Sequence, residues 1–333
     1  MKICIEEMRG LATLDDLKGK CFFVTGGTGF FGKSLLDLMK KGFLAESFLT
    51  ILSRDGDGFL KKYPEYADLK NVTFVQGDVR DFSFPPGKFD IIFHGAASAV
   101  TTLPPGEMRS VILEGTKRVL QFARSCRAEK LLFVSSGAVY GDFFSFDENI
   151  SENFPCAPVT EYGIAKLEAE KMCLDSDIAS VIARCFAFIG PRLNLDIHFA
   201  AGNFLRNCLK GEKIVIKGDG TPLRSYLYAD DLIEWLFAII ARGEAGEIYN
   251  VGSPAAVSIK ELAEEIASHF TPVPEIEILE KMIPGKAPQR YVPDVSKVQR
   301  VLGVDIQVPL AEAVELCKEF HRKKGGNNLS LGV

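Results

Sequence analysis

The chain has 333 residues, of which 47% are hydrophobic and 25% are charged, and its formal net charge is -5 at pH 7. This length and composition predict two lobes or one large α/β domain with a substantial core. The excess of acidic over basic residues argues against a protein that binds nucleic acid through a broad basic surface.

The cysteines and the apolar runs indicate the compartment. Eight cysteines are scattered along the chain without a C-x-x-C pair, which suits a reducing environment. No apolar run approaches the ~18 residues of a membrane span. We therefore expect a cytoplasmic protein with no nucleic-acid partner, no membrane partner and no metal site.

The first predicted strand, 22–24, is followed by four glycines within seven residues and then by an apolar-periodic helix. Gly27, Gly29 and Gly32 fit G-x-G-x-x-G, while Gly26, Gly29 and Gly32 fit G-x-x-G-x-x-G. Glycines let the backbone approach a pyrophosphate, and the start of a helix offers N–H groups to it. Strand, glycine turn and helix together predict a dinucleotide-binding turn.

The end of the second predicted strand, 47–52, indicates which cofactor is bound. A carboxylate about 20 residues past the glycines would hold the ribose 2′-hydroxyl of NAD, whereas an arginine suits a 2′-phosphate. Ser53 and Arg54 favour NADP, because a hydroxyl and a guanidinium complement a phosphate. Asp55 keeps NAD as the alternative.

The third and fourth predicted strands end in further candidate cofactor contacts. The Asp78 carboxylate can accept the adenine amino hydrogen while Val79 packs on the ring, although Asp78 could instead cap a short helix. Small residues after the fourth strand let the backbone approach the ribose and nicotinamide. These residues are Ala96, Ala97 and Ser98. His94 ends that strand and is expected to be a core histidine.

A candidate catalytic group follows the fifth predicted strand, 130–135. Ser136 lies at its tip, and the next helix, expected from Thr160, carries Tyr162 and Lys166 on one face. An ammonium lowers the pKa of a neighbouring phenol. Tyr162 could then move the proton of a hydroxyl that is oxidised or reduced, with Ser136 bonding the same oxygen. The spacing Y-x-x-x-K alone is a weak signal of a catalytic pair. Here it follows five β/α units, and this order strengthens the prediction.

The same helix carries two apolar stripes, which predict burial on two sides and hence a homodimer. One stripe consists of Ala165, Ala169 and Cys173, and the other of Ile164, Leu167 and Met172.

Beyond residue 190, Pro, Gly and shorter elements dominate, which predicts a smaller lobe. We expect a dinucleotide-binding domain over 1–190, with 1–19 as an N-terminal extension, and a substrate lobe over 191–333. Parts near 224–252 are expected to return to the first domain.

By these residues the chain resembles the extended short-chain dehydrogenase/reductases that act on nucleotide-linked sugars, in the epimerase/dehydratase branch. The resemblance runs from about Lys20 to about Lys323. It is carried by segments 25–32, 77–79, 94–97, 135–141, 162–166, 190–191, 218–220, 224–228 and 284–285, and by Arg290.

The resemblance implies a Rossmann fold, doubly wound around a parallel sheet of about seven strands, with a smaller C-terminal α/β lobe. It also implies a tightly held NAD or NADP and a nucleoside diphosphate-linked sugar (UDP, dTDP, CDP or GDP) as substrate. The implied cofactor contacts are Gly26, Thr28, Gly29, Phe30, Phe31, Gly32, Tyr162 and Lys166. The implied substrate contacts are Ser136, Asn203, Phe204, Arg224 and Arg290.

Two departures from the family pattern bear on the reaction. The 4,6-dehydratases have Asp-Glu after the active-site Ser or Thr, where this chain has Gly137 and Ala138, and family decarboxylases usually keep a Glu at the position of Ala138. The first hypothesis is therefore a nucleotide-sugar epimerase or 4-ketoreductase acting at C4. A dehydratase with Asp142 or His198 as replacement acid or base is the second, and a non-catalytic NADP-binding scaffold is the third.

Overall fold

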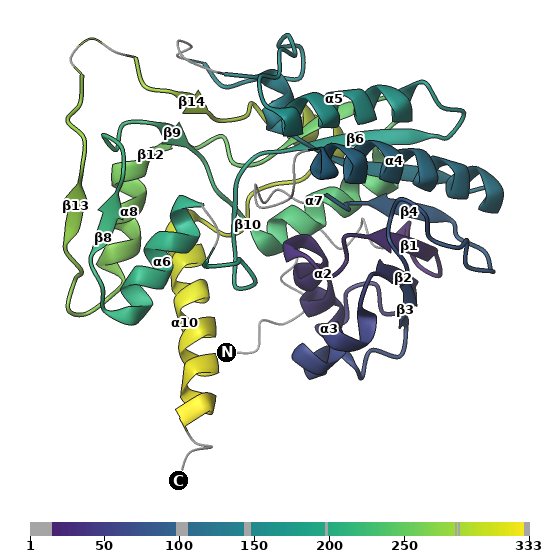
Figure 1. Ribbon diagram of the computed structural model, residues 1–333, viewed down its shortest axis with the longest axis horizontal. Coiled ribbons are helices and arrows are strands. Elements are labelled where there is room, and N and C mark those ends of the chain that lie inside the picture. The colour runs from purple at the N-terminus through teal and green to yellow at the C-terminus, as the bar shows by residue number, and fades with distance from the viewer. Residues whose placement is uncertain are drawn as a thin grey trace.

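The computed structural model describes residues 15–97, 106–142, 148–196, 199–283, 285 and 287–329. Its centre is a seven-stranded sheet in the order β11-β6-β5-β4-β1-β2-β3, in which every neighbouring pair is parallel. Helices cover both faces of this sheet, and a smaller group of elements lies beside it (Figure 1). The predicted doubly wound α/β fold is thereby confirmed.

The main sheet is built from strand-helix units. Its strands are β1 (Cys21–Thr25), β2 (Phe48–Ser53), β3 (Val72–Gln76), β4 (Ile91–His94), β5 (Lys130–Ser136), β6 (Ser180–Cys185) and β11 (Ile248–Val251). The helices that accompany them are α2 (Phe30–Lys40), α3 (Gly56–Lys62), α4 (Glu107–Cys126), α5 (Glu161–Leu174), α7 (Ala229–Arg242) and α9 (Ser296–Leu302). The strand order reverses between β1 and β4, and ligands of such sheets bind at the carboxyl edge beside this reversal.

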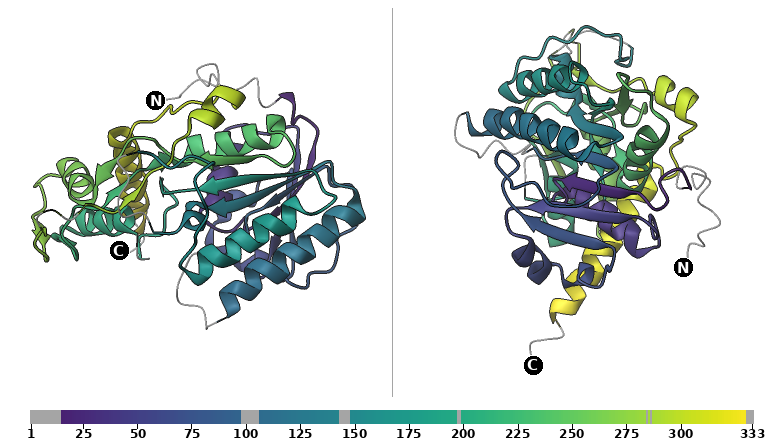
Figure 2. Two further views of the ribbon diagram at one scale, coloured as in Figure 1. Left: turned by 90° about the horizontal axis from the view of Figure 1, so that it is seen from above. Right: turned by 90° about the vertical axis from the view of Figure 1, so that its right-hand side faces the viewer.

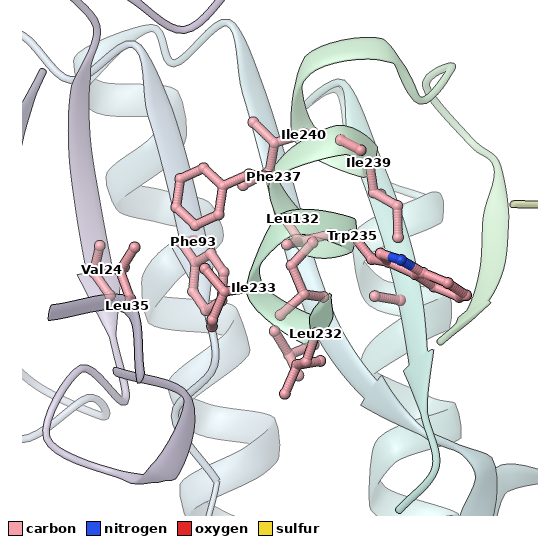
Figure 3. Close-up of a cluster of buried hydrophobic side chains, with 14 of the residues drawn as sticks. Val24, Leu35, Phe93, Leu132, Leu232, Ile233, Trp235, Phe237, Ile239 and Ile240 are labelled. Carbon is pink, nitrogen blue, oxygen red and sulfur yellow. The ribbon is translucent and has the colours of Figure 1, made fainter. Parts of the chain in front are cut away.

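One face of the sheet is covered by α2, α7 and α9. Helix α7 is apolar nearly all round, and Figure 3 shows its side chains against strands β1, β4 and β5. The ring of Phe237 lies 5.6 Å from that of Phe22 and 6.0 Å from that of Phe93, between centroids. Leu17, from the part of the predicted extension that the structure describes, is buried in the same core.

Helices α4 and α5 cover the opposite face (Figure 2). Phe23 of β1 anchors this second core, with its ring centroid 4.6 Å from that of Phe122 in α4. Ala165, Ala169 and Cys173 are fully buried, so small residues let α5 approach the sheet closely. This approach brings the start of α5 to the carboxyl ends of β5 and β6.

The smaller group of elements has its own core. The elements of this group are α6 (Ala200–Lys210), β8 (Ile214–Ile216), β12 (Val257–Ser258), α8 (Ile259–Ser268), β13 (Ile276–Ile278) and α10 (Leu310–Leu329). Residues 229–251 return to the main sheet as α7 and β11. The division of the chain at residue 190 stays a prediction.

The segment 223–228 forms two short strands. β9 (Leu223–Arg224) pairs with β12 and β14 (Arg290–Tyr291), whereas β10 (Leu227–Tyr228) pairs with β7 (Phe188–Ile189). The two halves take their backbone partners from different sheets, which no local pattern reveals.

Within the described ranges, no helix is both long and apolar enough to cross a membrane.

Candidate active site

The glycine turn brings β1, β4 and the start of α2 into close contact. Gly26 has φ +78°, and a Cβ placed on it would lie 2.5 Å from the carbonyl oxygen of Gly95. A Cβ on Gly32 would overlap the carbonyl group of Gly27. The N-cap of α2 is Gly29, and no side chain caps the helix. No capping side chain therefore occupies the first N–H groups of α2, which is the arrangement that suits a pyrophosphate.

The other predicted residues of this turn pack around it. Thr28 is half-buried. Phe30 and Phe31 have ring centroids 5.8 Å apart, and Phe31 contacts Phe188 of β7 at 5.3 Å. The aromatic pair thus joins the start of α2 to the strand that leads into the smaller lobe.

Asp55 and Arg54, which follow β2, have different surroundings. The Asp55 side chain caps α3 by accepting the Gly58 N–H, at 2.8 Å, and its backbone N–H donates to Ser53 Oγ, at 3.2 Å. Arg54 is exposed. The carboxylate that would favour NAD therefore already has a structural role, while the arginine that would favour NADP has its guanidinium in solvent.

Asp78, after β3, binds its near neighbour Arg80. Arg80 donates from Nε to Oδ1, at 2.7 Å, and from Nη2 to Oδ2, at 2.9 Å. These hydrogen bonds lower the pKa of Asp78, and the charge of Arg54 contributes. Val79 is buried against Gly115 of α4. Contacts of Asp78 and Val79 with adenine stay predictions.

The residues after β4 are held by Thr25. The Thr25 hydroxyl accepts the Ala96 N–H, at 3.1 Å, and bonds His94 Nδ1, at 2.8 Å. His94 Nε2 contacts Thr116 Oγ1, at 3.1 Å, and burial followed by the charge of Lys166 lowers the pKa of His94 to about 3. His94 is thus a neutral core histidine, as expected. Ala97 is half-buried, and Ser98 lies outside the described residues.

Ser136, Tyr162 and Lys166 are brought together where β5 meets α5. Thr160 caps α5 by accepting the Gly163 N–H, at 3.1 Å, which fixes the first turn that carries Tyr162. The Ser136 side chain lies close enough to the Tyr162 phenol to favour its ionised form. Lys166 is 2% exposed, and its Nζ lies 5.8 Å from the centroid of the Tyr162 ring.

The electrostatics of this group differ from the expectation. Burial raises the pKa of Tyr162 to about 12, and the opposing contribution comes from the Ser136 side chain. Lys166 instead donates from Nζ to the carbonyl oxygen of Val134, at 2.7 Å, and burial lowers its own pKa to about 8. In this structure burial therefore outweighs the contribution of the serine, and the Lys166 ammonium is not among the groups that shift the pKa of Tyr162.

Sequence reasoning missed a second tyrosine in this group. The phenol oxygen of Tyr291, on β14, would lie 2.6 Å from a Cβ placed on Gly137, the neighbour of Ser136, and its ring centroid lies 4.6 Å from that of Phe186. Its only sequence signal is that it follows Arg290 in a segment that carries the family resemblance. The segment that carries it is held by the pairing of β14 with β9 and by backbone hydrogen bonds between Ile150 and the residues after Tyr291.

The predicted substrate residues fall into two groups. Arg224 and Arg290 lie on the paired strands β9 and β14. Arg224 Nη2 donates to Gln289 Oε1, at 2.8 Å, and Arg290 Nη2 to Asn149 Oδ1, at 2.7 Å. Arg290 Nε is buried with no hydrogen-bond partner among the described residues. A buried unpaired donor calls for an acceptor.

The other two predicted substrate residues lie on α6. Phe204 is buried in the core of the smaller lobe, and Asn203 is half-buried. The alternative acid Asp142 is exposed, and His198 lies outside the described residues. The described ranges contain no cluster of three or more side chains that could hold a metal ion.

Comparisons with known proteins place this chain in one family. The model of the family described as "NAD dependent epimerase/dehydratase family" matches residues 22–252. UDP-glucuronic acid decarboxylase 6 of Arabidopsis thaliana is 30% identical over 319 residues, covering 91% of this chain and 89% of that protein. The dTDP-D-glucose 4,6-dehydratase of Homo sapiens is 28% identical over 261 residues, covering 74% of this chain and 73% of that protein.

Solved structures show the same fold. The UDP-glucose 4-epimerase of Thermotoga maritima, with UDP-glucose, has a TM-score of 0.78 at 23% identity, covering 91% of this chain and 99% of that one. The dTDP-glucose 4,6-dehydratase of Bacillus anthracis, in complex with NAD, has a TM-score of 0.79 at 20% identity. The match covers 92% of this chain and 98% of that one. By its family match and its curated relatives, the chain belongs to the NAD-dependent epimerase/dehydratase family.

Proposed function

We propose that this chain is an NAD(P)-dependent epimerase or 4-ketoreductase of nucleotide-linked sugars. The observation that carries the proposal is the group of Ser136, Tyr162 and Lys166 at the carboxyl edge of the sheet. The same edge holds the uncapped start of α2, with its glycine turn. A nicotinamide bound there would supply the hydride chemistry that side chains lack.

The three side chains have distinct proposed roles. The Tyr162 phenol oxygen takes or gives the proton of the sugar C4 hydroxyl, as a general base or acid. Ser136 orients the same hydroxyl and donates a hydrogen bond that stabilises the ionised phenol. Lys166 binds the ribose next to the nicotinamide, and its buried ammonium favours negative charge on Tyr162 when the two approach.

The diphosphate of the substrate is proposed to bind between β9 and β14. Arg224 and Arg290 are the cations there, and the buried Nε of Arg290 still has a hydrogen to donate. Guanidinium groups form charge-assisted hydrogen bonds with phosphate. The names of the similar proteins, which act on UDP- and dTDP-linked sugars, support a nucleotide sugar as the substrate class.

The residues after Ser136 favour epimerisation or reduction over dehydration or decarboxylation. Gly137 and Ala138 can neither protonate nor deprotonate a sugar carbon, although the similar proteins include dehydratases and a decarboxylase. A dehydratase would need a relocated acid. Asp142, the described candidate, is exposed.

The alternative to an enzyme is a non-catalytic NADP-binding scaffold. It would gain nothing from a phenol that lies beside a serine and a buried lysine. Any turnover by the purified protein would exclude it.

NADP is the proposed cofactor, although the solved relatives include NAD complexes. Asp55 is engaged as the cap of α3, while Arg54 is exposed beside it. A guanidinium in that position complements a 2′-phosphate better than a free ribose hydroxyl.

We further propose that the protein forms a homodimer through α5. The inner side of this helix is fully buried. Of the second predicted stripe, Ile164 is 38% exposed, whereas Leu167 and Met172 are half-buried against the chain's own core. Leu174, outside that stripe, is 37% exposed. A strictly monomeric mass in solution at micromolar concentration would contradict this.

The test is turnover of UDP- and dTDP-linked sugars, followed by the absorbance of the reduced nicotinamide and by product analysis. Stoichiometric consumption of reduced cofactor indicates a reductase, and an isomerised product without net consumption indicates an epimerase. Tyr162→Phe is expected to abolish either reaction. Full turnover by this variant would overturn both proposals, and a 4-keto-6-deoxy product would establish the dehydratase.

A further inference from the structure

Arg224 of β9 is held in place by neutral oxygen atoms. Its Nη2 donates to Gln289 Oε1, at 2.8 Å, and its Nη1 donates to the backbone carbonyl oxygen of Leu223, also at 2.8 Å. Within the part of the chain that the structure describes, Arg224 forms no ion pair with a carboxylate. Burial lowers its pKa, and the groups that oppose this effect are the phenols of Tyr226 and Tyr291.

Arginines elsewhere in the chain show how a buried guanidinium is otherwise stabilised. Arg184 is paired with Glu170, at 2.7 Å, and Arg192 with Asp37, at 2.6 Å. A carboxylate offsets the cost of removing the positive charge from water. Arg224 is half-buried with an amide in place of the carboxylate. Its charge is therefore available to an anion from outside the chain.

Gln289, which supplies that amide, is itself fixed by the backbone. Its carbonyl oxygen accepts the Leu223 N–H, at 2.7 Å, where β9 and β14 pair. A guanidinium has no acceptor, so the amide must present its oxygen to Arg224. Gln289 thus fixes the direction of the guanidinium without adding a negative charge.

Arg224 lies close to the proposed catalytic group. Its Cζ is 5.9 Å from the centroid of the Tyr291 ring. The Tyr291 phenol oxygen would lie 2.6 Å from a Cβ placed on Gly137, the residue after Ser136. A diphosphate bound by Arg224 would therefore adjoin a sugar bound at Ser136, as the two groups are joined in a nucleotide sugar.

Arg290, the second arginine proposed for the diphosphate, also has an amide as its partner. Its Nη2 donates to Asn149 Oδ1, at 2.7 Å, while Asn149 Nδ2 donates to the carbonyl oxygen of Pro254, at 3.0 Å. The diphosphate of a nucleotide sugar carries a negative charge on each phosphate. Arginines whose side-chain partners are neutral at both positions match these charges.

From this geometry we propose that Gln289 is a positioning residue, which orients Arg224 for the diphosphate of the substrate and leaves its charge unbalanced. A carboxylate at position 289 would compete with the phosphate for the same guanidinium. The identity of the ligand rests on the proposed function, but binding of a nucleoside diphosphate is measured without turnover.

The first test is Gln289→Glu, which keeps the size of the side chain and its acceptor and adds a negative charge. UDP, dTDP, CDP and GDP are titrated by calorimetry, and the nucleotide that the wild type binds should bind ~10–100-fold more weakly to the variant. The midpoint of urea unfolding should hold or rise, because an ion pair replaces a neutral hydrogen bond. A purely structural glutamine predicts wild-type affinity in this variant, and that result would overturn the proposal.

Gln121→Glu is the matched control. It makes the same change of charge at an exposed position of α4, so nucleotide affinity should stay at the wild-type value. An equal loss of affinity in this control would attribute the effect to the net charge of the protein and overturn the role of Gln289.

Gln289→Ala removes the acceptor without adding a charge. Affinity should fall only ~3–10-fold, because Arg224 keeps its charge and loses its orientation. In an Arg224→Ala background the same change should have no further effect, since Gln289 acts through Arg224. A further loss there would show that Gln289 contacts the nucleotide itself and would overturn the positioning role.

Turnover separates this inference from the proposed function. If the nucleotide binds in the predicted order and no sugar is converted, the function fails and the role of Gln289 stands. Where a sugar is converted, Gln289→Glu should raise KM and retain kcat, because the diphosphate is bound equally before and during the reaction. A lower kcat at unchanged KM would contradict the positioning role. Binding of none of the four nucleotides by the wild type would overturn both proposals.

Discussion

Arg184 of β6 and Glu170 of α5 form a buried ion pair beside the proposed catalytic residues, with Nη2 and Oε2 2.7 Å apart. Their side chains are 5% and 1% exposed. Glu170 also accepts a hydrogen bond from Ser135, the neighbour of Ser136, and lies one helical turn after Lys166. The pair therefore ties the helix that carries Tyr162 to β6, and the Ser135 hydrogen bond ties the same helix to β5, the strand that carries Ser136.

The first prediction concerns this pair. Glu170→Gln leaves the Arg184 charge buried without a counter-charge, and breaking such a pair costs about 3–5 kcal/mol. The free energy of unfolding in urea should fall by that amount. Glu168→Gln is the matched control on the same helix, since it breaks a pair with Arg109 in which both side chains are about 40% exposed. That change should cost less than ~1 kcal/mol. Equal losses in the two variants would contradict the structural role of the buried pair.

The parts of the site that sequence predicted are those that local patterns specify. The glycine turn, the helix after it and the Tyr162–Lys166 spacing each depend on residues within one strand-helix unit. The period of apolar residues and the position of glycines determine such a unit without reference to the rest of the chain. The core role of His94 was predictable for the same reason, because it ends an apolar strand.

The parts that sequence did not predict depend on pairing between distant segments. Tyr291 lies near the tip of β5 because its segment pairs with β9 and with Ile150, both far away in the sequence. Lys166 has the spacing of a residue that primes Tyr162, yet its Nζ is bonded to the Val134 carbonyl on the neighbouring strand. Spacing along a helix says which residues share a face, but not which acceptor of another element lies nearest.

The second prediction concerns the glycine turn. Gly32→Ala would press its Cβ against the backbone of Gly27, which has no flexible atom to move aside. We expect a loss of ~1–3 kcal/mol in the free energy of unfolding, with loss of dinucleotide binding measured by calorimetry. Gly218→Ala is the control, since a Cβ there meets nothing within 4 Å. Tight dinucleotide binding by Gly32→Ala would show that the turn does not hold the pyrophosphate.

The third prediction concerns the choice of cofactor. Arg54→Ala should weaken NADPH binding ~10–100-fold, the effect of one charge-assisted hydrogen bond. NADH binding should change less than ~3-fold, because NADH lacks the 2′-phosphate. Titration of both cofactors measures the ratio, with Lys61→Ala on the following helix as the control. Equal weakening of both would mean that Arg54 contacts a part common to them and would remove the support for NADP.

The fourth prediction concerns pH and the start of α7. Burial raises the pKa of Asp231 to about 7, although its carboxylate accepts the N–H groups of Val308 and Gln307, at 3.1 and 3.2 Å. The folded state therefore binds a proton at Asp231 that the unfolded state releases near pH 4. Stability from this group is fully present below pH ~4 and is lost as the pH rises towards 7.

Asp231→Asn removes this titration and keeps an oxygen that can accept the two N–H groups. The difference in unfolding free energy between the variant and the wild type should therefore grow in favour of the variant as the pH rises from ~4 to ~7. Asp230→Asn, at the neighbouring position, changes a side chain that is 26% exposed and paired with Lys41. It should give no comparable slope, because exposed pairs contribute little. Urea unfolding across this pH range measures both differences. A flat difference for Asp231→Asn would show that this carboxylate ionises as readily in the folded chain as in the unfolded one.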